Sequence, residues 1–317
     1  MKKLTHIFFV LIMLVVSSQP VLARQNEIIL SENEVREIVL NTVDVLEHDY
    51  LFPDKAKDVA QDLLHKLDIG AFDQSYPFGM FKQILENILI KATNDSGFEL
   101  VEREIHNPLK NKLTRQESNA IQVDMLENDI GYIRFDGDFL FSSAQNELDS
   151  AMAYLAESRA LIIDLRITGL GTLPLAQQLI SFFVAPDTVI ADVFLNPEEA
   201  PAKIIIQDNF INAQRFYDTP VYVLNSGFVV GPWEFVGYTL KYHHAAVIVG
   251  EDTMGVALMK KTLPVSQHAN LILTYAQTHH PKTNENWQDY GVIADYQVSA
   301  QESLKTAINL ATTEISR

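Results

Sequence analysis

The hydrophobic period of the chain changes once, near Asn94, and this change limits the fold more than any other feature. Before it, apolar residues recur at helical spacing in three segments, which Pro53 and the region 70–77 separate. Ser31 and Glu34 form a capping box at the start of the first segment. After it, short strand-like apolar runs alternate with amphipathic helical segments. This order predicts an α/β core preceded by a small helical subdomain without strands.

The elements of the second part are expected at defined places. Strands are expected at 131–135, 161–165, 188–195, 221–224 and 245–249, near 263, and at 271–275, and helices from Ser142, at 173–184, at 232–242 and from Gln301. Three parts follow from this pattern and from the N-terminus. They are a signal peptide at 1–23, a helical subdomain at 24–95 and an α/β core at 96–317.

The first residues have the pattern of a secretory signal peptide. Lys2 and Lys3 precede an uninterrupted apolar stretch from 7 to 16, and Ala23 provides a small residue for cleavage before Arg24. This stretch is too short to span a bilayer as a membrane anchor. We therefore expect a periplasmic or secreted protein that keeps no membrane anchor after cleavage.

Charge and cysteine content exclude several classes of function. The chain has 24 Lys and Arg against 41 Asp and Glu, a formal net charge of −17. Nucleic acids and anionic lipids are also negatively charged, so we expect neither as a partner. The chain has no cysteine, which excludes disulfides, thiolate catalysis and cysteine-bound zinc. An enzyme of this sequence would need serine, histidine, carboxylates or a metal.

Four segments resemble segments of one known family, and they occur in the family's order. They lie at 47–67, 160–183, 220–255 and 284–311, and the last three contain close relatives of D-L-R-x-N-x-G-G, G-E-x-T-x-G and N-W-E-G. The chain thus resembles the tail-specific (C-terminal processing) serine peptidases, on the branch with interphotoreceptor retinoid-binding protein and tricorn-like cores. The resemblance implies a ClpP/crotonase-like core without a PDZ insert and, in active members, a serine nucleophile. We expect no cofactor.

The catalytic positions that the resemblance implies are substituted in this chain. They fall on Val230 or Gly231 for the nucleophile, Val256 for the lysine base of one branch, Phe98 or Glu99 for the histidine of the other, and Gln288 for its carboxylate. Lys260 and Lys261 follow Val256 and are expected to be surface lysines of the next strand. Asp289 is adjacent to Gln288 and is the alternative carboxylate. The substitutions indicate that the fold persists without the chemistry, although whether the chain is an enzyme stays open.

The turn after the strand 161–165 would supply the oxyanion hole in the family. Asp164 and Arg166 are kept, whereas Thr168 and Leu170 replace the asparagine and the first paired glycine. Glycines there let backbone N–H groups approach a reacting carbonyl, so Leu170 is expected to crowd the hole. The alternative is a tolerated substitution in a loop.

Retained binding of peptides or protein C-termini is the function we expect first. The candidate binding residues surround the family's active-site mouth: Gly169, Leu170, Gly171, Gly231 and Trp233. The helix that begins after Gly231 would offer unpaired N–H groups and a positive dipole end to a carboxylate. Core packing is the alternative role for Trp233.

Two other functions remain open from the sequence. One is an active hydrolase with Ser226 as the nucleophile, although Asn225-Ser226-Gly227 is also ordinary turn chemistry. The other is a structural, oligomer-forming protein, and the sequence leaves the oligomeric state open. His243 and His244 suit a helix C-terminus, while His279 and His280 would point to opposite faces of a strand. His268 and Glu285 could at most complete a weak surface site, so we expect no metal.

Overall fold

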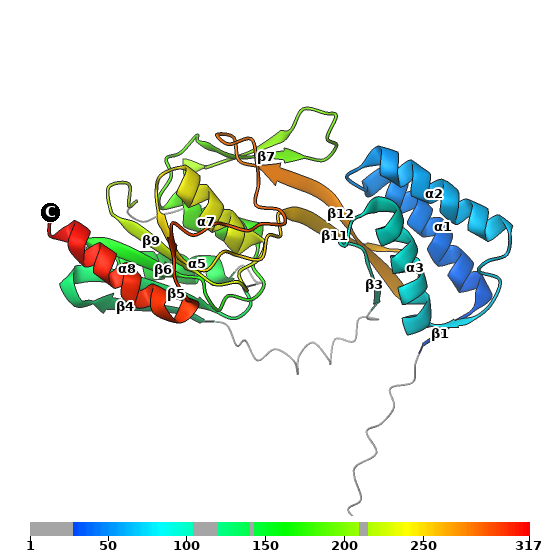
Figure 1. Ribbon diagram of the computed structural model, residues 1–317, viewed down its shortest axis with the longest axis horizontal. Helices are drawn as coiled ribbons and strands as arrows, with labels where there is room; N and C mark the ends of the chain where they lie inside the picture. The colour runs from blue at the N-terminus through cyan, green and yellow to red at the C-terminus, as the bar shows by residue number, and fades with distance from the viewer. Residues whose placement is uncertain (1–27, 104–119, 140–142, 209–214) are drawn as a thin grey trace, which may run out of the picture.

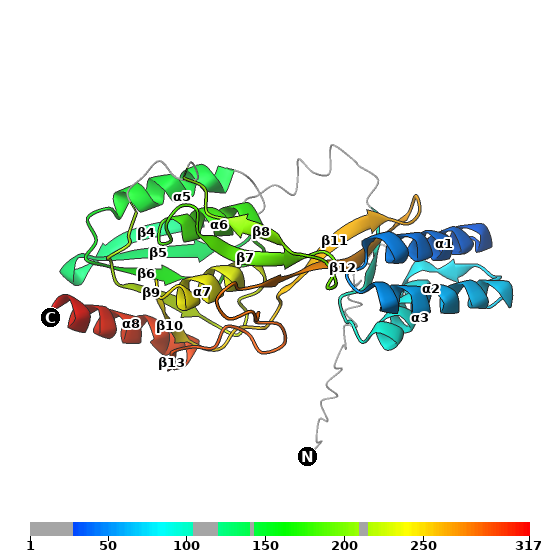
Figure 2. The same ribbon diagram turned by 90° about the horizontal axis from the view of Figure 1, so that it is seen from above.

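The structure, a computed structural model, describes residues 28–103, 120–139, 143–208 and 215–317. The expected signal peptide and the helix start at Ser142 lie outside these residues. Figures 1 and 2 show an elongated molecule with three helices at one end and an α/β core at the other. None of the helices in the described ranges is long and apolar enough to cross a membrane.

The core is a mixed α/β structure around a six-stranded sheet. The strand order is β13-β10-β9-β6-β5-β4, and every neighbouring pair is parallel except β4 with β5. The strands are β4 (Ala120–Leu126), β5 (Ile130–Asp136), β6 (Ala160–Asp164), β9 (Val221–Asn225), β10 (Val247–Gly250) and β13 (Tyr296–Gln297). All residues of β6 and β9 are buried, as expected for central parallel strands covered on both faces. The predicted α/β fold is confirmed.

Helices cover both faces of this sheet. They are α5 (Ser143–Tyr154), α6 (Leu173–Ser181), α7 (Pro232–Tyr242) and α8 (Ala300–Ile315). The side chains of β6 alternate between the faces, as strand geometry requires: Leu161 and Ile163 pack in the cluster with α6 and α7, whereas Ile162 packs against α8. Figure 2 shows α8 on the opposite side of the sheet from α5 and α6. The carboxyl ends of the strands are therefore left to loops.

A second sheet connects the core to the helical end. Its order is β11-β12-β7-β8, with β3 pairing with β12. The strands are β3 (Glu99–Glu102), β7 (Val189–Phe194), β8 (Ala202–Ile205), β11 (Leu258–Pro264) and β12 (Ala269–His279). The first part of β12 pairs with β3 beside the helices, and its end pairs with β7 beside the core. One long hairpin thus belongs to both ends of the molecule (Figure 1).

The helical end consists of α1 (Glu32–Asp49), α2 (Pro53–Asp68) and α3 (Phe78–Thr93). The hydroxyl of Ser31 accepts a hydrogen bond from the Glu34 N–H at 3.3 Å, which is one half of the predicted capping box. The other half is absent, because the Glu34 carboxylate bonds to Ser266 and His268 instead. The prediction of helices without strands was wrong, because β1 (Ile29–Leu30) pairs with β2 (Tyr76–Pro77). Strands also close this cluster: Leu100 of β3, Leu271 of β12 and Val265 in the turn before β12 are buried in it. Three helices leave one apolar face open, and the hairpin covers it.

The predicted strands and helices of the core are all present. Four further strands, β3, β4, β8 and β13, were not predicted. β8 and β13 have four and two residues, which is too short for a period to be read.

Candidate functional site

The candidate site lies where the loop before α7 meets the loop after β10. Both loops donate to one buried side chain: the Gly231 N–H and the Val256 N–H reach Glu234 Oε2 at 2.8 and 2.9 Å. The two nitrogens therefore lie within about 5.7 Å of each other, the sum of those distances. The other oxygen, Oε1, accepts from the Thr253 hydroxyl at 2.5 Å and from the Gly255 N–H at 2.6 Å. Glu234 thus joins the expected nucleophile and lysine positions.

The backbone at Gly231 has a conformation that other residues rarely adopt. Its φ of +56° and ψ of −117° lie on the strand-to-helix turn after β9. A strained turn of this kind presents the nucleophile in α/β-hydrolases. A Cβ atom at Gly231 would have no heavy atom within 4 Å, so the space for a side chain is open. The turn is present and the hydroxyl is missing.

A cavity of about 250 Å³ adjoins Gly231 and Val256. Its walls are mostly apolar and come from several elements, with Leu173 of α6, Phe235 of α7 and Trp287 among them. Among the lining residues, Lys260 of β11 carries an ionisable group and Thr278 of β12 carries a hydroxyl. An apolar concave site with few polar groups is typical of ligand binding.

The segment around Trp287 braces the loop that carries Val256. The Trp287 indole N–H donates to the Val256 carbonyl at 3.1 Å. Gln288 Oε1 accepts from the N–H groups of Ala257 and Leu258 at 2.9 and 3.1 Å. Its amide nitrogen donates to the exposed carboxylate of Asp289 at 2.7 Å. Gln288 therefore supports backbone at the position of the orienting carboxylate, and Asp289 does not line the cavity.

The turn after β6, where the family has its oxyanion hole, uses its backbone N–H groups in hydrogen bonds within the chain. The Leu170 N–H donates to Asp138 Oδ1 at 2.7 Å, and the Gly169 N–H donates to the Gly137 carbonyl at 2.8 Å. The side chain of Leu170 is 56% exposed, so it is not packed into the turn. A carboxylate, that of Asp138, holds the Leu170 N–H that an oxyanion would need.

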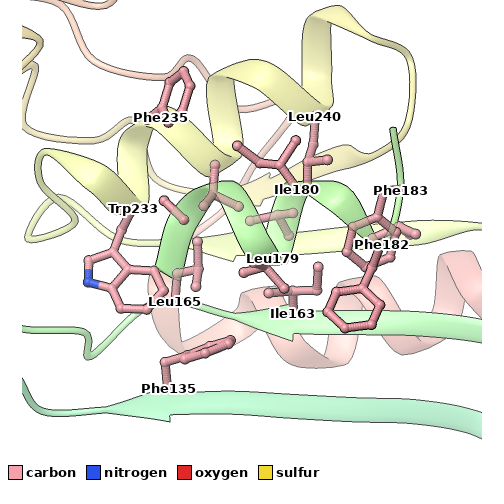
Figure 3. Packing of buried hydrophobic residues seen from close by; sticks show 14 of the residues in the cluster. Phe135, Ile163, Leu165, Leu179, Ile180, Phe182, Phe183, Trp233, Phe235 and Leu240 are labelled. Carbon is pink, nitrogen blue, oxygen red and sulfur yellow. The ribbon is translucent and has the colours of Figure 1, made fainter. Parts of the chain in front are cut away.

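Trp233 belongs to the core and does not line the mouth of the site. It is 1% exposed, and its ring centroid lies 4.9 Å from that of Phe135. Figure 3 shows its indole directed toward Phe135 and Leu165, while Phe235 points to the other side of α7. The Trp233 indole N–H donates to the Gly169 carbonyl at 3.1 Å. A Cβ atom at Gly171 would lie 2.8 Å from this nitrogen, so Gly171 permits the packing.

The start of α7 does not offer the expected anion site. The backbone N–H of Gly231 donates to Glu234, and Pro232 has no N–H. The backbone N–H of Trp233 donates to the Val230 carbonyl at 3.3 Å. The buried carboxylate of Glu234 also opposes the positive end of the helix dipole. A ligand carboxylate would be repelled here, so Gly231 is not the anion-binding residue that we expected.

The cation suited to a ligand carboxylate is Lys260. Within the described ranges, no carboxylate lies within 4.0 Å of its ammonium group. A Cβ atom at Gly97 would lie 3.1 Å from Lys260 Cε, which places the turn before β3 beside this side chain. Lys261, the next residue, instead forms an ion pair with Asp49. Sequence reasoning had grouped the two lysines together, and strand alternation separates them.

Residues 129–298, more than half of the chain, match the family described as Peptidase family S41. The chain belongs to peptidase family S41. The resemblance to C-terminal processing peptidases is thereby confirmed.

Solved structures share the fold of this S41 chain. A lipoprotein from Streptococcus agalactiae superposes with a TM-score of 0.64 at 12% identity, covering 90% of this chain and 97% of the other. The photosystem II D1 C-terminal processing protease gives a TM-score of 0.58 at 12% identity, covering 84% and 93%. At such identity the likeness concerns the fold alone.

Curated relatives match a smaller part of the chain. The DNA mismatch repair proteins MutS of Bartonella tribocorum and Bartonella henselae are 28% and 27% identical over 155 residues. The match covers 43% of this chain and 17% of each relative's length. This partial likeness assigns no activity to the S41 chain.

The remaining catalytic positions of the S41 family are filled by structural residues. Phe98 is 3% exposed and packs on Tyr50, with ring centroids 5.0 Å apart, and the neighbouring Glu99 pairs with Lys82 at 2.8 Å. The histidine position of one branch is thus part of the helical cluster.

Ser226 has the geometry of a turn residue. It is 3% exposed, its hydroxyl donates to the Arg166 carbonyl at 2.7 Å, and it accepts from the Phe228 N–H at 3.3 Å. Its proton is committed to a backbone carbonyl, and His243 and His244 lie at the other end of α7. Among the described residues, the hydroxyl of Ser226 bonds to backbone groups and to no side chain that could act as a base.

Two histidines meet that the sequence did not pair. The rings of His243 and His280 lie 4.9 Å apart, and the Nε2 atoms of both are buried without a partner in the described structure. Burial lowers the pKa of each to about 4. His279 lies elsewhere, against Phe194, and His268 pairs with Glu34 at 2.6 Å. Across the described ranges, no three His, Asp or Glu side chains could jointly hold a metal.

Proposed function

We propose that this S41 chain is an exported homologue that binds peptides or protein C-termini and does not cleave them. One observation carries the proposal: Glu234 holds Gly231 and Val256 together beside a cavity, and neither residue has a catalytic group. The basic, then apolar N-terminus supports export.

The missing groups bear directly on the rate of any hydrolysis. Acyl transfer by this family needs a nucleophile, a base and an oxyanion hole. Gly231 and Val256 supply neither of the first two, and Asp138 occupies an amide of the third. In well-studied triads, loss of the nucleophile or base alone costs several orders of magnitude in rate.

Peptide binding does not require a nucleophile, a base or an oxyanion hole. It requires an apolar cavity and a cation for the terminal carboxylate, and both are present. The apolar walls suit the last side chain of a peptide, and the ammonium of Lys260 suits the terminal carboxylate. Glu234 is not among the lining residues, although it lies behind Gly231 and Val256 and disfavours a ligand carboxylate at that end. The terminal carboxylate is therefore assigned to Lys260.

A serine-reactive fluorophosphonate should not label the protein. The mature chain from Arg24 is incubated with the probe beside an active S41 peptidase, and intact mass is measured. The variant Gly231→Ser should also stay unlabelled, since its hydroxyl fits the open space but finds Val256 where a base is needed. A single adduct on the wild type that Ser226→Ala abolishes would instead restore this chain as an enzyme.

Peptides with free, apolar C-termini should bind with micromolar affinity, and their C-terminal amides should bind about tenfold more weakly. Lys260→Met should remove this difference, because the carboxylate loses its partner. Lys261→Met is the matched control on the same strand, since Lys261 pairs with Asp49 and does not line the cavity. Isothermal titration over a varied peptide set measures both effects. Equal binding of acids and amides, or no binding at all, would reject the proposed function.

A further inference from the structure

Thr278 is the one hydroxyl-bearing side chain among the described residues that line the cavity. It lies on β12, is 5% exposed, and its hydroxyl has no hydrogen-bond partner in the described part of the chain. Its cross-strand neighbour on β7 is Val193, whose side chain has no polar atom to offer. The Thr278 hydroxyl is therefore a buried polar group at the cavity wall that lacks a hydrogen-bond partner among the described residues.

A buried hydroxyl without a partner costs free energy that a valine of the same shape would not. The cost disappears when a ligand supplies the missing hydrogen bond. Threonine places its hydroxyl and its methyl group at neighbouring rotamer positions, so rotation about χ1 can exchange the two groups within the cavity wall. Another polar group of the cavity lining, the indole N–H of Trp287, already donates to the Val256 carbonyl.

We infer that the side chain taken into the cavity ends in an uncharged polar atom, a hydroxyl or a carboxamide, which bonds to Thr278. This inference rests on the proposed function, and Lys260 remains the partner of the terminal carboxylate. A hydroxyl both donates and accepts, so Thr278 serves either group. An ionised side chain is disfavoured, because Lys260 is the one cation among the described lining residues and already pairs with the terminal carboxylate, which leaves a second charge desolvated without a partner. The cavity of about 250 Å³ has room for one such side chain.

The test compares peptides that differ only in the last residue: Thr against Val, Gln against Met, and Tyr against Phe. By isothermal titration, the wild type should bind the polar member of each pair about fivefold more tightly. Thr278→Val should abolish or reverse this preference, and Thr278→Ser should keep it. Equal or tighter binding of the apolar members by the wild type would overturn the inference alone. Failure of every peptide to bind would overturn the proposed function together with it.

A control variant separates the cavity from the strand. Thr274 also lies on β12 with a fully buried, unpartnered hydroxyl in the described structure, but it does not line the cavity. Thr274→Val should leave the preference unchanged. Both valine variants should unfold at or above the wild-type temperature, since each removes an unpaired buried hydroxyl. Loss of the preference in Thr274→Val would overturn the role assigned to Thr278.

Discussion

Replacing Glu234 with alanine is expected to lower the free energy of unfolding by about 3–5 kcal/mol, because buried donors lose their acceptor. Glu234 is fully buried, and its two oxygens accept four hydrogen bonds. Alanine leaves all four donors without an acceptor, and three of them are backbone N–H groups. Chemical denaturation measures the loss, and the melting temperature should fall by about 10 °C.

The matched control is Glu302, at the corresponding position of α8. It also lies three residues after the N-cap, where its N–H donates to Ser299 Oγ at 3.3 Å, but its carboxylate is exposed. Glu302→Ala should therefore cost about 1 kcal/mol or less. Glu234→Gln should fall between, because one of its two terminal atoms becomes a donor that faces donors. If Glu234→Ala were as stable as Glu302→Ala, the joining role of Glu234 would be wrong.

Glu234 also explains why the site keeps its shape without its catalytic groups. The carboxylate bonds to backbone N–H groups at Gly231, Gly255 and Val256, and these bonds do not depend on the side chains there. A serine and a lysine could be absent from these positions and the loops would still meet. The site therefore keeps its shape through backbone hydrogen bonds even though the catalytic side chains are absent.

The fold was predictable because it rests on local signals. The period change near Asn94 separates three helices from an α/β core, and the strands that lead into Arg166 and Ser226 are continuous apolar runs. The substituted positions Gly231 and Val256 were also located by counting within these segments, and the structure brings them together.

The ligand-facing residues were not predictable, because they depend on contacts between distant segments. Glu234 carries one local signal, its place three residues into a helix, which is that of a capping box. Nothing in its neighbourhood indicates that the loop 253–256 also binds it. Lys260 and Lys261 look alike in the sequence, and only the path of β11 assigns one to the cavity and the other to Asp49.

The pairing of His243 with His280 shows the same limit. One residue follows α7 and the other follows β12, and their meeting depends on how the second sheet packs over α7. Sequence reasoning considered each histidine beside its chain neighbour, His244 or His279. The structure separates those neighbours and joins two histidines that lie far apart in the chain.

This histidine pair should make the protein lose stability in mild acid. The pKa of each is lowered from 6.5 to about 4, first by burial and then by nearby positive charge, from Lys282 for His243 and from His243 and Lys282 for His280. Between these two pH values the unfolded chain binds protons that the folded chain does not. The stabilisation is complete above pH 6.5 and is lost as the pH falls toward 4. A shift of this size is worth about 3 kcal/mol for one group, and the coupled pair shares its protons.

The double variant His243→Phe/His280→Phe should remove this dependence while keeping two aromatic rings in contact. Denaturation at about pH 7 and about pH 4.5 should show the wild type losing about 3 kcal/mol more than the variant. The subtraction cancels the carboxylates, which titrate in both proteins. His244→Asn, an exposed neighbour at φ +59° that asparagine tolerates, should behave like the wild type.

Equal acid sensitivity in wild type and double variant would show that the two imidazoles are not buried together. The packing of the segment 280–291 over α7 would then be wrong. Because that segment carries Trp287 and Gln288, the same experiment tests whether the cavity wall is formed as described.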